Sequence, residues 1–148
     1  MVDHSLVERL LVVCLEDACS HQELEPALRV LYQDLPGVSL SLLTSRPHPS
    51  SPPLAEVLSY CPGEQSVLDL VDAVRLCRFD AALILTRPGH SPYLPAYACY
   101  LAGVRWRFGQ SLEFGGGVLS HRLAPEPDLT LLARRAAREM LRASDEPA

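Results

Sequence analysis

The run from Phe79 to Thr86 (FDAALILT) constrains the fold more than any other stretch of this chain. It is too short for a typical helix and too uniformly apolar for a strand with one wet face, so it is typical of a central strand of a parallel sheet that is buried on both faces. The chain breaks over residues 87–92, then continues as an apolar helical segment, Pro95–Ala102, and a second strand, Val104–Phe108. Strand, loop, helix and strand in this order indicate the βαβ unit of an open α/β sheet.

The end of this unit predicts both backbone geometry and a place for a site. Gly103 directly follows the expected helix, where a left-handed residue commonly ends a helix. The strand Val104–Phe108 alternates apolar and basic side chains, so we expect one of its faces to be wet. Open α/β sheets bind ligands outside the carboxyl ends of their strands. The loops 87–91 and 109–117 should therefore border a crevice.

The rest of the chain supplies further elements of the same kind. Ser20 and Glu23 form the capping-box pattern in front of an apolar helical stripe that runs from Leu24 to Leu35. The other expected elements are strands at Arg9–Leu15, Val38–Leu43, Ser66–Leu68 and Val118–Leu123, and helices at Leu54–Tyr60, at Val71–Arg78 and after Asp128. We therefore predict a single Rossmann-like three-layer αβα domain with a mainly parallel sheet over residues 1–143, followed by a frayed tail at 144–148.

Composition excludes several classes of function. A net charge of −5 argues against a nucleic-acid binder, which normally has a basic excess. Five cysteines without CxxC spacing and without a secretory signal indicate reduced thiols in a cytoplasmic protein and no zinc site. The apolar run Leu10–Leu15 is too short to span a bilayer, so no transmembrane segment is expected. The dispersed histidines and the absence of a GxGxxG motif predict neither a metal nor a cofactor.

The last expected helix has an apolar face and a basic one. The basic face carries Arg134, Arg135, Arg138 and Arg142. Solvated surface is the simpler interpretation of such a face, and an anionic partner is the alternative.

Several segments resemble the amino-terminal domain of glycosyltransferase family 9, the bacterial heptosyltransferase-type enzymes. They are RLLVVCL at Arg9–Leu15, PALRVL at Pro26–Leu31, RFDAALILT at Arg78–Thr86 and SPYLPAYACYLAGVRWRFGQSLEFGGGVLSHRL at Ser91–Leu123. The resemblance implies one half of a GT-B arrangement, in which the amino-terminal domain holds the acceptor and the carboxy-terminal domain holds a nucleotide-sugar donor, without a metal. The acceptor is often a phosphorylated lipid core sugar. The chain ends where the first domain would end, so we expect the donor half to be absent.

The resemblance also bears on catalysis. Family members usually have Gly-Asp just before the first helix, and that Asp is the base that activates the acceptor. The pair falls on Cys19-Ser20 here, and a serine hydroxyl is not a base near neutral pH. Glu16 and Asp17 could substitute only if the loop were rebuilt. We therefore predict no catalytic residue, and Ser20 is also explained as a helix cap.

Residues near the expected crevice are candidates for ligand binding. The Gly115-Gly116-Gly117 amides could cradle an anion, although a tight turn explains them equally simply. Ser91 is also a plausible helix-start residue, and isolated arginines are common on surfaces. The candidates are Ser20, His90, Ser91, Arg107, Gly115 and Gly116, and Arg87, His121 and Arg122 would add positive charge at the same rim.

Three functions remain open. The favoured one is a stand-alone, non-catalytic domain that binds a protein partner or an anionic sugar or lipid-linked acceptor. The second is the acceptor-binding half of a split glycosyltransferase that works with a separate donor-domain chain. The third is a structural or oligomerisation unit. A lone domain has to cover its crevice face or leave it wet, so we expect a homo-oligomer or a protein partner.

Overall fold

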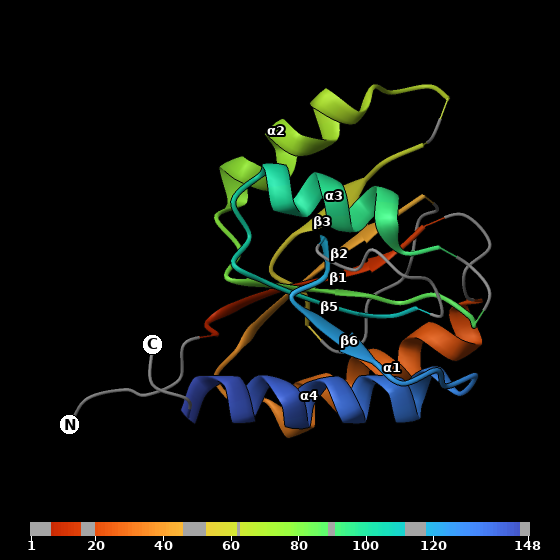
Figure 1. The fold of residues 1–148 in the computed structure, drawn as a ribbon, viewed down its shortest axis with the longest axis vertical. Coiled ribbons are helices and arrows are strands. Elements are labelled where there is room, and N and C mark those ends of the chain that lie inside the picture. The colour runs from red at the N-terminus through yellow and green to blue at the C-terminus, as the bar shows by residue number, and fades with distance from the viewer. Residues whose placement is uncertain are drawn as a thin grey trace.

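The computed structural model describes residues 7–15, 20–45, 53–61, 63–88, 91–111 and 118–145. These residues form a parallel six-stranded sheet in the order β3-β2-β1-β4-β5-β6 (Figure 1). The strands are β1 (Arg9–Cys14), β2 (Ser39–Thr44), β3 (Val57–Ser59), β4 (Ala81–Ile84), β5 (Trp106–Gln110) and β6 (His121–Leu123). The helices are α1 (His21–Asp34), α2 (Val67–Cys77), α3 (Tyr93–Leu101) and α4 (Leu129–Asp145). The predicted Rossmann-like αβα fold is confirmed.

The sheet is covered on both faces, as a parallel sheet requires. Helices α1 and α4 lie side by side on one face, and α2 and α3 lie on the other (Figure 1). Successive side chains of a strand point to opposite faces. In β1, Leu10 and Val12 therefore join the core under α1 and α4, whereas Leu11 and Val13 join the core under α2 and α3.

Strand β4 explains the apolar run from which the fold was predicted. Ala81 and Leu83 face α1 and α4, and Ala82 and Ile84 face α2 and α3. All four are almost completely buried, because β4 lies between β1 and β5 and has a helix layer on each side. A strand in this position has no wet face, which removes the usual alternation from its sequence.

Two sequence-based assignments between β2 and α2 are wrong. The segment expected to be a helix at Leu54–Tyr60 contains the edge strand β3, which pairs with Leu42–Thr44 of β2. The segment expected to be a strand at Ser66–Leu68 is the start of α2, where the Ser66 hydroxyl accepts a hydrogen bond from the Asp69 backbone N–H (3.2 Å). Residues 57–59 form a strand because they pair with β2, and the segment from Ser66 is helical because the Ser66 side chain caps the start of α2.

Among the other expectations from the sequence, one is confirmed and several are wrong. Gly103 has the left-handed φ expected of it (+87°). The wet face expected for the strand at Val104–Phe108 is wrong, because Arg107 is buried. Helix α4 continues to Asp145, two residues into the segment expected to be a tail. The expectation of reduced thiols is wrong for Cys14, which is disulfide-bonded.

Candidate functional site

The strand order puts the predicted position of the ligand crevice between β1 and β4. Strand β1 pairs with β2 on one side and with β4 on the other, so the order of the strands reverses at this point. Ligands of open α/β sheets bind outside the carboxyl ends of the strands at such a reversal. The start of α1 and the segment Leu85–Arg87 after β4 border this position. We refer to it below as the crevice.

Ser20 begins α1 with a complete capping box. Its hydroxyl accepts a hydrogen bond from the Glu23 backbone N–H (3.3 Å), and its own backbone N–H donates to Glu23 Oε1 (3.2 Å). Both groups satisfy backbone donors that a helix start leaves open. The cap therefore explains Ser20 structurally, and ligand contact by Ser20 stays a prediction.

Substitution of Ser20 tests the cap. Ser20→Ala is expected to lower the free energy of unfolding by about 1 kcal/mol, because the Glu23 N–H loses its acceptor. Chemical denaturation measures the loss, and Ser20→Asp is the control because Asp is an equally good cap. A loss in Ser20→Asp as large as that in Ser20→Ala would contradict the capping role.

Glu23 and Arg87 form an ion pair between the two borders of the crevice. The Arg87 guanidinium donates to Glu23 Oε1, and both side chains are partly exposed. Glu23 is a carboxylate in the first turn of α1, and sequence analysis had recognised it only as the partner of Ser20. The position of Arg87 three residues after the end of β4 was the signal that could have revealed the pair, because the segment after β4 borders the start of α1.

Thr86 lies next to this ion pair and has an unsatisfied hydroxyl. Its side chain is buried, and its Oγ1 has no hydrogen-bond partner in the structure as described. Its backbone carbonyl accepts a hydrogen bond from Gln110 Nε2. A buried polar atom without a protein partner is normally satisfied by water or by a ligand. Thr86 thus places a buried, unsatisfied hydroxyl after the carboxyl end of β4, which no sequence motif revealed.

Ser91 lies at the other side of the loop that follows β4. Its hydroxyl accepts a hydrogen bond from the Tyr93 backbone N–H (3.2 Å) at the start of α3. The Tyr93 hydroxyl is 2.9 Å from Ser111 Oγ, which connects this helix start to the end of β5. The contacts of Ser91 are those of a helix-start residue, and its binding of a ligand stays a prediction.

Arg107 is a buried cation held by backbone carbonyls. Its Nε donates to Val118 O (2.5 Å), and its Nη1 donates to Val104 O (2.6 Å) and Arg105 O (3.1 Å). The guanidinium also lies 5.1 Å from the centre of the Tyr100 ring. These contacts tie the start of β5 and the residues just before it to the segment before β6. Contacts of this kind stabilise the fold. Binding of a ligand by Arg107 stays a prediction.

Cys99 lies buried in α3 near Arg107. Burial raises the pKa of its thiol to about 12, and the positive charge of Arg107 offsets part of this increase. The thiol is therefore protonated at neutral pH. Only the thiolate is a strong nucleophile, so Cys99 is unsuited to nucleophilic catalysis.

The remaining candidates, His90, Gly115 and Gly116, lie outside the described residues, as do Glu16, Asp17 and Cys19. In the part of the chain that the structure covers, no three His, Cys, Asp or Glu side chains gather as a metal site. Within the same residues, no helix combines the length and the apolar character needed to cross a bilayer.

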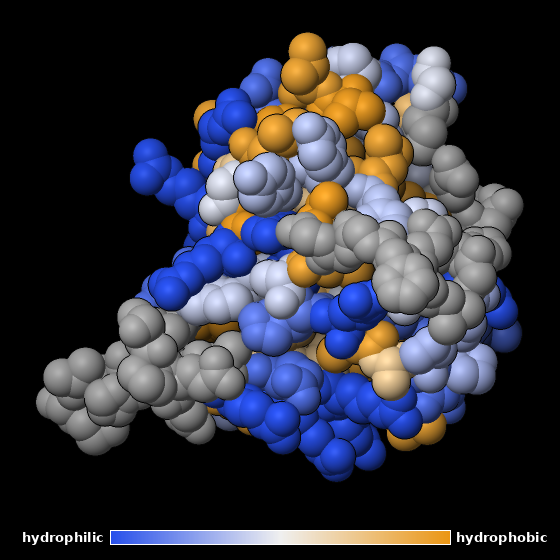
Figure 2. Space-filling view, viewed as in Figure 1, coloured by the Kyte–Doolittle hydropathy of each residue, from blue (hydrophilic) through white to orange (hydrophobic). Residues whose placement is uncertain are grey.

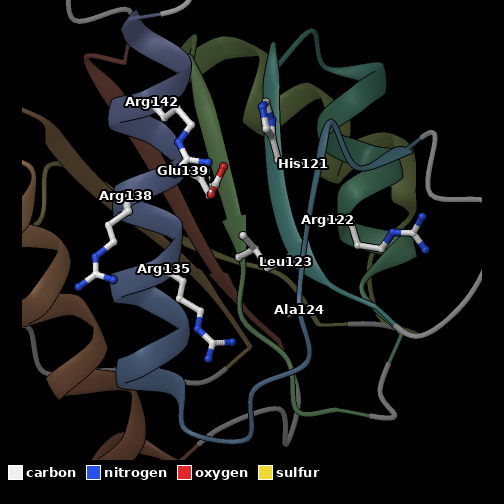
Figure 3. Close-up of a pocket in the computed structure, with 8 residues that line it drawn as sticks. All are labelled: His121, Arg122, Leu123, Ala124, Arg135, Arg138, Glu139 and Arg142. Atoms are coloured by element: carbon white, nitrogen blue, oxygen red, sulfur yellow. Dashed lines mark ion pairs between the residues drawn. The ribbon is translucent and has the colours of Figure 1, made fainter.

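A separate cavity of about 550 Å³ lies between β6 and α4 (Figure 3). In Figure 3 Arg122 points from β6 away from α4, and Arg138 points from α4 away from β6. Arg135 pairs with Glu126 (3.2 Å). Arg142 pairs with Glu139 (3.5 Å). The lining residues are His121, Arg122, Leu123, Ala124, Arg135, Arg138, Glu139 and Arg142. Arg135 and Arg142 are thus paired with the protein's own carboxylates, which favours the solvated-surface interpretation of this helix face.

Comparison with solved structures supports the fold. The chain is similar to the structure of Escherichia coli ADP-heptose LPS heptosyltransferase II, with a TM-score of 0.59 and 18% identity over 85% of this chain. It spans 40% of the length of that enzyme. A structure of RSP in complex with β-NADH is also similar, with a TM-score of 0.49 and 13% identity over 95% of this chain and 64% of that one.

No protein-family model matches the sequence, and no curated protein matches it. At 18% identity the similarity to the heptosyltransferase shows a shared fold. The resemblance noted from the sequence is therefore confirmed as a similarity of fold.

Proposed function

We propose that this chain is a non-catalytic glycosyltransferase-like domain that binds a phosphorylated sugar or lipid head group in the crevice. The observation that carries the proposal is the partly exposed Arg87 guanidinium, which lies at the predicted ligand position next to the start of α1. The fold shared with heptosyltransferase II supports a sugar-type ligand, because that similarity includes most of this chain.

Arg87 gives the ligand its chemical class. A guanidinium binds phosphate through two parallel charge-assisted hydrogen bonds, and such bonds are about twice as strong as neutral ones. Arg87 donates to Glu23 in the structure, and nearly half of its side-chain surface is exposed. An incoming phosphate would replace Glu23 as the partner of Arg87. Glu23 would then remain bonded to the Ser20 backbone N–H.

Ser20 supports the absence of catalysis. The resemblance implies a carboxylate base at this position, and the serine present there uses its hydroxyl in the cap of α1. A positioned base typically contributes about 10² to 10⁴ in rate. Among the described residues, the carboxylate bonded to Ser20 is that of Glu23, and it is bound to a cation and to a backbone N–H, both of which compete with a substrate proton.

Thermal unfolding with mannose 6-phosphate and with mannose tests the proposal. Mannose 6-phosphate at about 100 times its Kd should stabilise the protein by roughly 2.7 kcal/mol, which corresponds to about 5 to 10 °C in Tm for a domain of this size. Mannose alone should have a much smaller effect. Arg87→Ala should remove most of the shift. The control is Arg105→Ala, which should retain the shift, because Arg105 is an exposed arginine just before the start of β5.

Two results would contradict the ligand proposal. One is no shift with mannose 6-phosphate or with a phosphorylated lipid head group. The other is an equal shift in wild type and Arg87→Ala. The second result would place anion binding elsewhere in the molecule.

Glu23 also favours a second candidate function, the acceptor-binding half of a split glycosyltransferase. If the phosphate takes Arg87, the Glu23 carboxylate becomes available at the start of α1 to accept a proton. This alternative predicts sugar transfer only when the chain is mixed with a separate donor-domain chain, and loss of that transfer in Glu23→Gln. Transfer that persists in Glu23→Gln would exclude Glu23 as the base.

A further inference from the structure

Strand β6 forms an open edge of the sheet. It is the last strand in the order β3-β2-β1-β4-β5-β6, and within the described residues no strand pairs with the side of β6 that faces away from β5. The outer side of an edge strand presents backbone N–H and C=O groups without a partner strand, and an extended segment of another chain can pair with them. The side chains around this edge therefore determine which segment fits.

One side of α4 lies next to this edge. The apolar side of α4 packs on the sheet, and on another side Arg134 pairs with Asp34 of α1 (3.8 Å). Four further side chains recur at the i, i+3, i+4 and i+7 spacing that places residues on one side of a helix, and we call them the α4 stripe: Arg135, Arg138, Glu139 and Arg142. The α4 stripe and β6 together line the cavity of about 550 Å³ (Figure 3).

This cavity has the position of the side chains of a further strand. The His121 ring stacks on the buried Phe108 ring (4.6 Å between ring centres), and Leu123 belongs to the core under α1 and α4, whereas Arg122 points away from α4 (Figure 3). A strand added beside β6 at the usual spacing of about 4.8 Å would alternate in the same way. Every second side chain of the added strand would then enter the cavity next to α4.

The charge of the cavity gives the added strand its chemistry. Four arginines and one glutamate line the cavity, which gives it a net charge of +3, although the whole chain has a net charge of −5. Figure 2 shows hydrophilic residues gathered over α4, at the bottom of the molecule. A positive cavity favours carboxylates on the side chains that enter it. Pairing of β6 with the β6 of a second copy would instead bring two positive surfaces together, which is unfavourable.

The ion pairs of the α4 stripe leave its arginines accessible. Arg135 pairs with Glu126 and Arg142 pairs with Glu139, but the two arginine side chains are 47% and 71% exposed. Exposed ion pairs of this kind contribute little to stability. The α4 stripe is solvated surface in the free chain, and an incoming carboxylate can replace the protein's own carboxylates as the partner of either guanidinium.

We propose that the open edge of β6 and the α4 stripe bind an extended segment of another protein that carries carboxylates at alternate positions. The backbone of this segment pairs with β6, and its carboxylates enter the cavity and bind Arg135 and Arg142. The proposal names a surface and a chemistry for the protein partner expected from the sequence. It does not depend on the ligand of the crevice between β1 and β4, because β5 lies between β6 and that position.

Fluorescence anisotropy of the full chain with labelled peptides tests the proposal. The peptide EVEVEVE should bind saturably, and KVKVKVK should not bind, because its lysines meet the arginines of the cavity. The backbone control is EVEVEVE with N-methyl groups on its third and fourth residues, which keeps the charge. One of these two adjacent N–H groups faces β6 in either register, so its loss should raise the Kd at least about tenfold.

A pair of double variants tests the α4 stripe. Arg135→Ala/Arg142→Ala should raise the Kd of EVEVEVE roughly tenfold, because two cationic partners of the carboxylates are lost. The matched control is Arg29→Ala/Arg134→Ala, which removes the same charge from exposed ion pairs with Glu25 and Asp34. The control should change the Kd less than about twofold, since both arginines lie away from the cavity lining. Circular dichroism checks that both variants are folded.

Three results would overturn the proposal. They are no saturable binding of EVEVEVE up to about 1 mM, equal binding of the N-methylated peptide, and equal losses in the two double variants. Equal binding of the N-methylated peptide would show attraction of a simple anion without strand pairing. Failure of EVEVEVE to bind while mannose 6-phosphate still stabilises the chain would overturn this proposal and leave the crevice proposal intact.

Discussion

Arg107→Ala is expected to lower the free energy of unfolding by about 3 kcal/mol, even though Arg107 was predicted to bind a ligand. The substitution leaves the carbonyls of Val104, Arg105 and Val118 without their donor and opens a cavity next to Tyr100. An unsatisfied buried acceptor costs about 1 to 3 kcal/mol. Part of this loss is offset, because burial of the unpaired cation itself carries a desolvation cost. Urea denaturation measures the net effect.

Arg105→Ala is the matched control for Arg107→Ala. Arg105 is exposed, and its guanidinium lies over the Trp106 ring at 4.4 Å from the ring centre. Its removal should cost less than about 1 kcal/mol, the value of an exposed cation–π contact. Equal losses in the two variants would contradict the structural role of Arg107. The structural role also predicts that ligand raises the Tm of Arg107→Ala by as much as it raises that of wild type.

Gln110→Leu is expected to lower the free energy of unfolding by about 2 to 3 kcal/mol. The Gln110 side chain is buried at the end of β5, where Nε2 donates to Thr86 O and to Glu126 O (3.0 Å) and Oε1 accepts from Glu126 N (2.6 Å). Leucine has a similar volume, so packing is largely kept. The cost therefore comes from three backbone groups that lose their partner in a buried place.

Gln22→Leu is the control for Gln110→Leu, because Gln22 is exposed on α1 and the chemical change is the same. Its effect should be within about 0.5 kcal/mol. Gln110 connects the end of β4 to the segment that leads into α4, so hydrogen exchange of the Glu126 N–H should accelerate in Gln110→Leu. A loss below 1 kcal/mol with unchanged exchange would show that this bridge is replaced by other contacts.

The elements that the sequence predicted well are those whose signal is local. The apolar run at β4, the helical stripe of α1, the Ser20 cap and the left-handed Gly103 each follow from a pattern within a few residues. Burial on both faces of a parallel sheet and backbone capping act at that range, so these features could be predicted without knowledge of their neighbours.

The errors arose where a partner distant in the sequence decides the structure. Strand β3 exists because it pairs with β2, and its three residues carry no strong pattern of their own. Arg107 is buried because carbonyls from Val104 and Val118 surround its guanidinium, whereas the alternation of apolar and basic side chains indicated a wet face. Hydrogen bonds between segments outweigh local patterns in both cases.

The sequence by itself determined the fold class and the use of Ser20 as a cap, because these depend on periodicity and on local backbone capping. Only the tertiary structure brought Glu23 to Arg87, left the Thr86 hydroxyl buried without a partner, and placed one side of α4 next to the open edge of β6. The physical reason is that contacts between side chains on different elements depend on how the helices and strands pack, and no pattern along one segment contains that information.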